Sequence, residues 1–440
     1  MNQKLFIFTI ILLITSQAFA KNLYKEKPAF YSYIIADTKT NHIYEEQASD
    51  VYATPASCLK TVTALVALKT LGPDYQYETK LYKTSGQDIV ISFSGDPTLT
   101  SKNLMELLKP LKNTKIDGKL ILDGSIYSTP VHSTNNVIGD IGTPYGQPVS
   151  GVNIDENLII IKVNPTIEGK LAHVANDVGY KIKSTIITSS EASAVKFIWD
   201  GTQVKASGSI NIEDKDREFK ISPETIDPYV LFKMQKLLKQ LNIQGKIQII
   251  HDKKQLPTDL VLVKALKSEK LKDFMVPAMK ISDNLVFDSL YLKIIHSYST
   301  EEITDWSQGD KIIKALIEQH FSIDMDKALF VDGSGLSRLN RIQPKQLLEM
   351  LKQGASSPEF ISSLSKPGEE KTLLINRKTL PDNIRAKSGG MLGISCLCGY
   401  SISTGKPKTF VIMANSFAPP AKEFLEVIDN FVKTHVGERT

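Results

Sequence analysis

Three short polar motifs, far apart in the chain, constrain this sequence more than any other feature. They are Ser57-Cys58-Leu59-Lys60, Ser282-Asp283-Asn284 and Lys387-Ser388-Gly389. Each motif alone occurs by chance in many chains of 440 residues. Together they supply a nucleophile, a base, a proton relay and an anchor for an anion. A fold that uses them in this way must bring all three to one site.

The chemistry starts from Ser57, because a serine hydroxyl is a poor nucleophile without a base within hydrogen-bond reach. Lys60 can be that base only when neutral. Its pKa, ~10.4 in a free lysine, must therefore fall through burial and through a second cation, for which Lys387 is the candidate. Ser282 would pass the proton between Lys60, Ser57 and the leaving amine. This set of groups is typical of serine acyl transferases that act on D-alanyl peptides and β-lactams.

The remaining polar groups of the motifs suit substrate binding. The Asn284 side chain can hold a substrate amide, while the charge of Lys387 and the hydroxyl of Ser388 can hold a terminal carboxylate. The developing oxyanion needs two backbone donors, and we expect these to be the N–H groups of Ser57 and Gly390.

Each motif also has a simpler reading. Lys60 could lie on a solvated helix face, Lys387-Ser388-Gly389 could be a turn, and Ser282-Asp283-Asn284 could break or cap a helix. The Gly-rich segment Asp332–Arg338 is interpreted as a structural turn near the site, with direct substrate contact as the alternative. The joint occurrence of the three motifs in one order favours the catalytic interpretation.

The first 20 residues read as a secretory signal peptide. Lys4 precedes an apolar run from Leu5 to Ile14, and Ala18-Phe19-Ala20 supplies a small-residue cleavage site. The run is too short to span a membrane. Lys21, rather than cysteine, follows the site, which argues against a lipoprotein. We therefore expect a soluble, periplasmic product with no transmembrane anchor after signal removal.

The composition limits the partners and cofactors. A formal net charge of +5 is too mild and too dispersed to indicate nucleic acid. Three cysteines in an exported chain exclude a disulfide scaffold; Cys396 and Cys398 share one face of a likely strand, so a bridge between them would be strained. Cys58 is interpreted as a small buried residue. The seven histidines show no zinc-ligand spacing, so we expect no metal and no cofactor.

Local patterns predict a mixed fold. The pattern predicts a hairpin formed by Phe30–Asp37 and His42–Gln47. It also predicts a helix with Thr54 as its N-cap and Pro55 as its first residue, which places Ser57 in the first turn. A strand is expected from Lys387–Gly390 through Ile394–Ser401, paired with the strand that follows it.

Between the first two motifs, residues 77–261 change to short strands separated by turns. Because the motifs must meet, this block is predicted to be inserted structure. Its middle, Pro165–Ile221, is rich in Thr, Ser, Lys and β-branched residues, and is predicted to be a small β domain nested inside a mixed one. The last helix, Ala421–Val436, is predicted to pack on the strands that precede it rather than on a membrane.

The chain also resembles the low-molecular-mass class C penicillin-binding proteins of the penicillin-binding protein 4 kind. The resemblance covers nearly all of Lys21–Thr440. It rests on the following segments: Pro55–Lys60, Leu71–Asp74, Gly95–Leu99, Lys280–Asn284, Asp332–Arg338 with Asn340, and Ala386–Gly389.

This resemblance implies an α+β fold, in which a transpeptidase/β-lactamase-like domain with an antiparallel sheet and flanking helices is interrupted by two nested inserted domains. The expected catalytic domain is 21–76 with 262–440, the inserted mixed domain is 77–164 with 222–261, and the nested β domain is 165–221. It implies that Ser57, Lys60, Ser282, Asn284 and Lys387 keep the roles given above.

The implied activity is that of a serine D-alanyl-D-alanine carboxypeptidase and peptidoglycan endopeptidase. Its partners would be peptidoglycan stem peptides and cross-links, with β-lactams as inhibitors. Two segments depart from the family pattern. The usual Lys-Thr-Gly is Lys387-Ser388-Gly389, which keeps the hydroxyl. The segment near the pocket for the diaminopimelate side chain reads Gly139-Asp140-Ile141-Gly142, where Asp140 is the candidate acid.

Two other functions fit parts of the sequence. A class A β-lactamase shares the three motifs, but it lacks room for residues 77–261 and needs a Glu-x-x-x-Asn deacylation segment, which is not found between Asn284 and Lys387. A catalytically silent cell-wall binding protein of the same fold is the second alternative. Retention of every polar residue of the site argues against it.

Overall fold

The structure is a computed structural model that describes residues 28–200, 203–402, 405–418 and 421–437. The predicted signal peptide lies outside these residues. The chain forms two compact units. Of the described residues, the first unit contains those within Met1–Asp74, Leu271–Asp283 and Ser307–Thr440, and the second contains those within Tyr75–Lys270 and Asn284–Trp306. The second unit therefore interrupts the chain of the first at two places.

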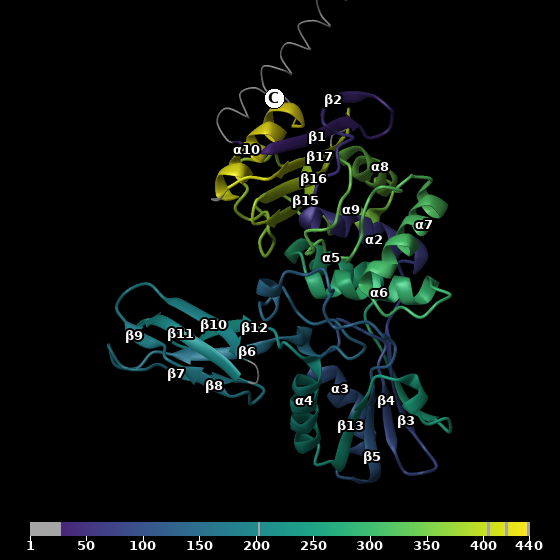
Figure 1. Ribbon diagram of the computed structural model, residues 1–440, viewed down its shortest axis with the longest axis vertical. Helices are drawn as coiled ribbons and strands as arrows, with labels where there is room; N and C mark the ends of the chain where they lie inside the picture. The colour runs from purple at the N-terminus through teal and green to yellow at the C-terminus, as the bar shows by residue number, and fades with distance from the viewer. Residues whose placement is uncertain (1–27, 201–202, 403–404, 419–420, 438–440) are drawn as a thin grey trace, which may run out of the picture. The chain divides into compact units, whose positions relative to one another are not determined.

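The first unit is built on a five-stranded antiparallel sheet with the order β15-β16-β17-β1-β2 (Figure 1). The strand bounds are β1 Phe30–Asp37, β2 Ile43–Gln47, β15 Ile384–Met391, β16 Ile394–Ser401 and β17 Lys408–Asn415. The predicted hairpin is β1 and β2. The prediction of one strand from Lys387–Gly390 through Ile394–Ser401 is wrong, because the chain turns back at Leu392 and Gly393 and forms two antiparallel strands, β15 with Lys387 and β16. Because β15 lies at the edge of the sheet, one of its sides is open to other partners.

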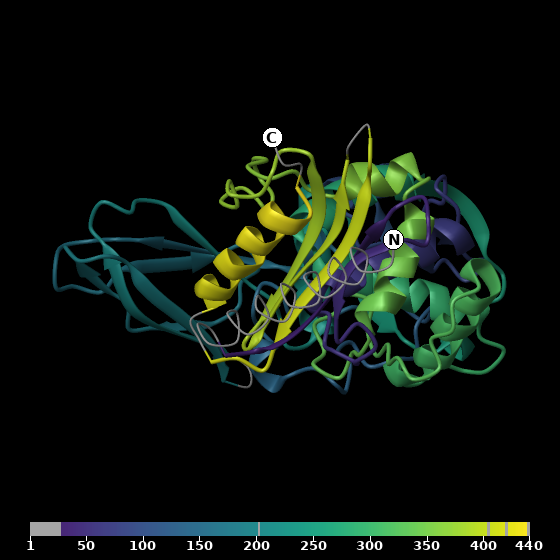
Figure 2. The same cartoon turned by 90° about the horizontal axis from the view of Figure 1, so that it is seen from above.

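Helices cover both faces of this sheet (Figure 2). On one face, α10 packs against β16 through a stripe that includes Phe424, Ile428 and Phe431. A buried ion pair joins Arg377 to Asp429 of α10. On the other face, α8 packs against β17 and β1. The helices of this unit are α2 Leu59–Thr70, α5 Leu271–Ile281, α7 Gly309–Phe321, α8 Pro344–Gly354, α9 Pro358–Ser363 and α10 Ala421–His435. The predicted packing of the last helix is confirmed.

The second unit contains a mixed sheet of five strands with the order β13-β5-β4-β3-β14. Strands β13, β5 and β4 run parallel, whereas β3 and β14 complete the sheet by antiparallel pairing. Helices α3 and α4 pack against each other and against this sheet. The bounds are β3 Glu78–Lys83, β4 Ile89–Ser92, β5 Lys115–Asp123, β13 Gln244–Ile250, β14 Val261–Lys267, α3 Ser101–Leu108, α4 Ile226–Gln240 and α6 Asn284–Tyr298.

Two small sheets also belong to the second unit. One is antiparallel with the order β12-β6-β7, and in the other β11 pairs with β10, β8 and β9. The bounds are β6 Ile159–Asn164, β7 His173–Asn176, β8 Ile182–Ser184, β9 Ile187–Ser189, β10 Ala194–Asp200, β11 Gln203–Asn211 and β12 Arg217–Ile221. The residue boundaries predicted for the two inserted domains stay a prediction.

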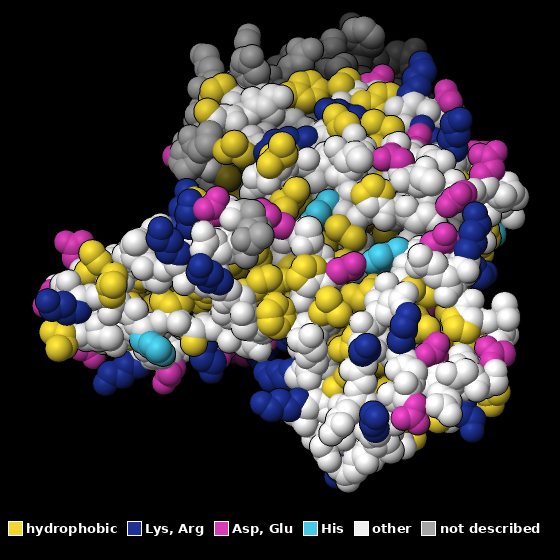
Figure 3. Space-filling model, turned by 60° about the horizontal axis from the view of Figure 1, so that its bottom comes forward, with side chains coloured by type: hydrophobic (Ala, Val, Ile, Leu, Met, Phe, Trp, Pro, Cys, Tyr) yellow, Lys and Arg dark blue, Asp and Glu magenta, His cyan; other side chains and the backbone are white. Residues whose placement is uncertain are grey.

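The predicted α+β fold class, with an antiparallel sheet and flanking helices, is confirmed. No helix within the described part of the chain has both the length and the apolar character needed to cross a membrane. On the face shown in Figure 3, Lys and Arg side chains are scattered among Asp and Glu rather than gathered into one patch.

Candidate active site

Ser57 and Lys60 face each other at the start of the first long helix. Ser57 lies in the 3₁₀ turn η1, Ala56–Cys58, which leads directly into α2. Lys60 Nζ donates a hydrogen bond to Ser57 Oγ at 3.0 Å. Lys60 is fully buried, whereas Ser57 is partly exposed. The hydroxyl can therefore meet a substrate while the amine stays away from water.

The prediction that Thr54 caps this helix is wrong. Pro55 occupies the N-cap position of η1 and no side chain caps it. Thr54 is held by other neighbours, since its N–H donates to Asn415 Oδ1 at 3.0 Å and Arg341 donates to its hydroxyl. The chain then turns through Ala56, whose φ of 46° is rare for a residue with a side chain. The first helical turn is thus shaped by contacts with distant residues.

Lys387 and Ser282 form a second polar pair in the first unit. Lys387 Nζ donates to Ser282 Oγ at 2.9 Å and to the backbone oxygen of Ser388 at 2.6 Å. The thiol of Cys58, next to Ser57, donates to the backbone oxygen of Lys387 at 3.3 Å. This contact places β15 against η1. Burial lowers the pKa of Lys387 to about 8.

The open side of β15 follows from the alternation of its backbone groups. Ala386 and Ser365 exchange two backbone hydrogen bonds, of 3.0 and 3.1 Å, on the side away from β16. In an antiparallel pair without a bulge, every second residue turns its N–H and C=O to the same side. Ser388 and Gly390 therefore also direct theirs to the open edge. This orientation suits Gly390 as an oxyanion donor.

Two glycines allow the backbones around Ser57 to approach closely. A Cβ atom at Gly389 would lie 2.9 Å from Ser57 N and 2.8 Å from Pro55 O. One at Gly335 would lie 2.0 Å from Ala56 O, and Gly335 also has a φ of +80°. Any larger residue at either position would push β15 or the Asp332–Arg338 turn away from η1.

The Asp332–Arg338 turn holds the lysine, a role that the sequence did not reveal. The backbone oxygen of Ser334 accepts a hydrogen bond from Lys60 Nζ at 2.7 Å. Asp332 is buried and shapes the turn by accepting from Gly335 N at 2.7 Å and Ser337 N at 2.6 Å. A backbone carbonyl leaves no residue-type signal in a sequence. The glycines of the turn were the one feature of the sequence that indicated a close approach between this turn and another part of the backbone.

Ser282 owes its position to the end of α5. Its N–H donates to Met279 O and the N–H of Asp283 donates to Ala278 O, which closes the helix. Ser282 itself has a φ of 61°. A non-glycine residue in this left-handed conformation carries strain on the order of 1 kcal/mol, and here it turns the hydroxyl to Lys387.

Asn284 and Asp140 are brought together in the second unit. Asn284 opens α6, and its Nδ2 donates to the backbone oxygen of Tyr145 at 2.8 Å. The hydroxyl of Tyr145 donates to Asp140 Oδ1 at 3.3 Å. Asp140 ends the 3₁₀ turn η3, Ile138–Asp140. Tyr145 therefore links Asn284 and Asp140, which were predicted to bind substrate on separate grounds.

The three cysteines are free thiols and all are buried. Cys396 Sγ donates to the backbone oxygen of Thr54 at 3.6 Å. As predicted, Cys58 behaves as a small buried residue, and it packs where β15 meets η1.

Comparison with known proteins identifies the family. The model of the D-Ala-D-Ala carboxypeptidase 3 (S13) family matches residues 16–434. The chain belongs to this family. D-alanyl-D-alanine carboxypeptidase DacB of Haemophilus influenzae is 25% identical over 88% of this chain and 85% of its own length. D-alanyl-D-alanine carboxypeptidase of Actinomadura sp. strain R39 is 25% identical, with 88% and 78% covered.

Solved structures share the fold. The crystal structure of penicillin-binding protein 4 from Haemophilus influenzae superposes with a TM-score of 0.81 at 22% identity, and the match covers 95% of this chain and 99% of that one. The same protein has been solved in complex with a β-lactam. The resemblance drawn from the motifs is therefore confirmed at the level of family and fold.

The pKa of Lys387 predicts a pH dependence. Because this amine is charged below about pH 8 and neutral above it, its attraction for a terminal carboxylate should be lost as the pH rises. We expect kcat/KM for a D-alanyl-D-alanine peptide to fall above pH 8, by up to roughly tenfold per pH unit. The same peptide with a C-terminal amide is the control and should not show this fall; an equal fall for both would contradict the anchoring role.

Proposed function

We propose that the chain is a serine D-alanyl-D-alanine carboxypeptidase and peptidoglycan endopeptidase that works through an acyl-enzyme on Ser57 and is inhibited by β-lactams. The observation that carries this proposal is the hydrogen bond between the partly exposed Ser57 hydroxyl and the buried Lys60 amine, in a chain of the S13 family. The Lys387–Ser282 pair, connected to the same turn through Cys58, supplies the other groups that the reaction needs.

Acylation follows from these contacts. Neutral Lys60 takes the proton of Ser57, whose oxygen attacks the carbonyl carbon between the two D-alanines. The N–H groups of Ser57 and Gly390 stabilise the negative charge on the carbonyl oxygen. Ser282 passes a proton to the departing amine, which leaves as free D-alanine. Water then attacks the ester and releases the shortened peptide, with Lys60 again acting as the base.

The terminal carboxylate is assigned to Lys387 and Ser388. The ammonium of Lys387 is buried at 3% exposure, so its charge is poorly screened by water. A β-lactam offers a strained amide and a carboxylate at similar spacing, so it can enter the same site. Because its leaving group stays tethered to the acyl group, we expect the ester to be long-lived.

Endopeptidase activity is proposed from the second unit and the open edge of β15. An extended peptide can add to a free strand edge by backbone hydrogen bonds. The backbone N–H and C=O groups of Ser388 and Gly390 point to the open edge of β15. Asn284 is proposed to bind a substrate amide, and Asp140 to bind the free amine of the side chain at the third peptide position. The Tyr145 link between these two residues supports a shared role.

The proposed setting is the periplasm, reached by an N-terminal signal peptide. The proposed partners are stem peptides and cross-links of peptidoglycan, and β-lactam antibiotics as inhibitors. No cofactor is required, because every step uses side chains and backbone groups of the chain itself.

The first test concerns the nucleophile. Ser57→Ala should stay folded but lose both covalent labelling by fluorescent penicillin and release of D-alanine. Ser356→Ala changes an exposed serine of the same unit and is the matched control. Intact-mass evidence of penicillin on another residue would disprove the assignment. Rapid turnover of the label by the unaltered protein would indicate a β-lactamase, and no labelling at all would indicate a silent binding protein.

The second test concerns the base. Lys60→Arg keeps a positive charge but cannot deprotonate under these conditions. We expect the rate of acylation to fall by a factor on the order of 10² to 10⁴, measured by stopped-flow labelling. Lys69→Arg, on the exposed last turn of the same helix, is the control. An active Lys60→Arg enzyme would exclude the proposed role.

The third test concerns Asp140. Loss of a charge-assisted hydrogen bond costs about 1.5–3 kcal/mol, or roughly 10- to 100-fold in affinity. Asp140→Ala should therefore raise KM for diaminopimelate-containing peptides to that extent. Penicillin acylation should stay almost unchanged, because a β-lactam lacks this side chain. Equal losses on both substrates, or none on either, would refute the assignment to the side-chain pocket.

A further inference from the structure

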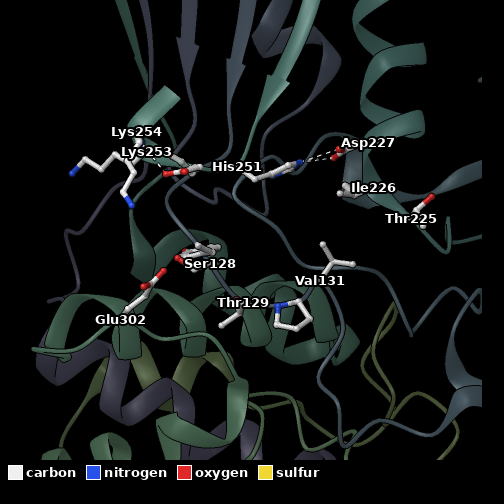
Figure 4. A pocket seen from close by; sticks show the side chains of 14 residues that line it. Ser128, Thr129, Val131, Thr225, Ile226, Asp227, His251, Lys253, Lys254 and Glu302 are labelled. Carbon is white, nitrogen blue, oxygen red and sulfur yellow. Dashed lines mark hydrogen bonds and ion pairs between the residues drawn. The ribbon is translucent and has the colours of Figure 1, made fainter. Parts of the chain in front are cut away.

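The second unit contains a cavity of about 910 Å³ that the proposed reaction does not use. Three segments and one further residue line it (Figure 4). The segments are the loop that follows β5, the start of α4 and the loop that follows β13, and the further residue is Glu302, beyond the end of α6. None of the proposed catalytic or substrate-binding residues is among those that line it. Its volume is in the range of cavities that hold small ligands, about 300–1,000 Å³.

The cavity lies where a parallel sheet favours ligand binding. Strands β5 and β13 are parallel neighbours, and Asp123 at the end of one pairs with Ile250 at the end of the other. The lining segments Ser125–Val131 and His251–Lys254 follow these ends directly. Helix α4 begins at the same edge. Loops at the carboxyl ends of parallel strands commonly form binding sites, because helix N-termini and loop N–H groups gather there.

Two lysines give the cavity its cationic side. Lys253 and Lys254 belong to the 3₁₀ turn η5, Lys253–Gln255, and both side chains are exposed. Within the described part of the chain, neither ammonium forms an ion pair. The backbone of η5 is fixed by Asp252, whose carboxylate accepts from Lys254 N at 2.9 Å. Two adjacent charges on a fixed turn suit a carboxylate ligand.

The remaining walls carry paired or acidic groups. His251 Nε2 and Asp227 are 2.9 Å apart, and this hydrogen bond raises the pKa of His251. The negative charge of Asp227, which lies in the first turn of α4, is therefore partly neutralised when His251 is protonated. Glu302 lines the cavity as an acid that can meet a ligand amine. Val131 and Ile226 add apolar surface suited to small methyl groups.

We propose that this cavity binds a stem peptide of peptidoglycan, a short chain with carboxylates, amines and alanine methyl groups, as a second site apart from the catalytic serine. The carboxylates would meet Lys253 and Lys254, and an amine would meet Glu302. The proposal rests on the proposed function, because it takes the ligand from the same polymer. Such a site would hold the enzyme on its substrate between cleavage events and raise the local concentration of cross-links.

The experiment separates this site from the catalytic one. The protein is first acylated with penicillin G; intact mass verifies one adduct per chain, and peptide mapping verifies that the adduct is on Ser57. The stem tripeptide L-alanyl-γ-D-glutamyl-meso-diaminopimelate is then titrated by calorimetry. We expect 1:1 binding to the acylated protein. The Lys253→Glu/Lys254→Glu double variant should weaken binding at least tenfold while penicillin acylation stays unchanged.

The matched control is Lys112→Glu/Lys115→Glu, which makes the same charge change near the amino end of β5 and should leave binding intact. A tripeptide with amidated carboxylates should bind much more weakly. Absence of binding to the acylated protein, or equal affinity in both double variants, would overturn the second site. Failure of penicillin to acylate the protein would instead contradict the proposed function, so the two failures are distinguishable.

Discussion

The arrangement of the site depends on one buried amine. Lys60 has no exposed surface, and its Nζ lies between Ser57 Oγ at 3.0 Å and the backbone oxygen of Ser334 at 2.7 Å. A buried amine without partners would be costly. The carbonyl of Ser334 satisfies one donor and fixes the direction of the nitrogen, so that the Ser57 hydroxyl can donate to the lone pair of the neutral form. The Ser57 hydroxyl is thus held in a fixed direction by the buried amine.

Two close backbone contacts keep this amine in place. The Asp332–Arg338 turn touches Ala56 O through Gly335, and β15 touches Ser57 N through Gly389. Buried Asp332 holds the turn by accepting backbone N–H groups, and the contact between Cys58 and Lys387 O ties β15 to the helix start. The serine is therefore fixed from two sides by elements far away in the chain. Precision of this kind requires small residues at the contacts, which explains the glycines.

The sequence predicted the elements of the site better than the contacts between them. The β1–β2 hairpin and the strand Ile394–Ser401 followed from local patterns of apolar residues and turns, whereas the turn that separates β15 from β16 was not predicted. The role of Ser334 could not be predicted, because its carbonyl contacts Lys60 from 274 positions away and any residue type would offer the same group. The capping prediction for Thr54 failed for a related reason, since Asn415 and Arg341 compete for its polar groups.

The second unit contains a cavity that is lined by its own residues. Its five-stranded sheet has a parallel half, and the carboxyl ends of β5 and β13 meet at the same level beside the start of α4. The segments that follow β5 and β13 therefore lie together and line the hollow. In this chain the side chains of Lys253, Lys254 and Glu302 line the hollow, and close-packed apolar side chains do not fill it. Packed apolar side chains in the hollow would stabilise the second unit more than exposed charges do. The charged groups at this edge suit a polar ligand.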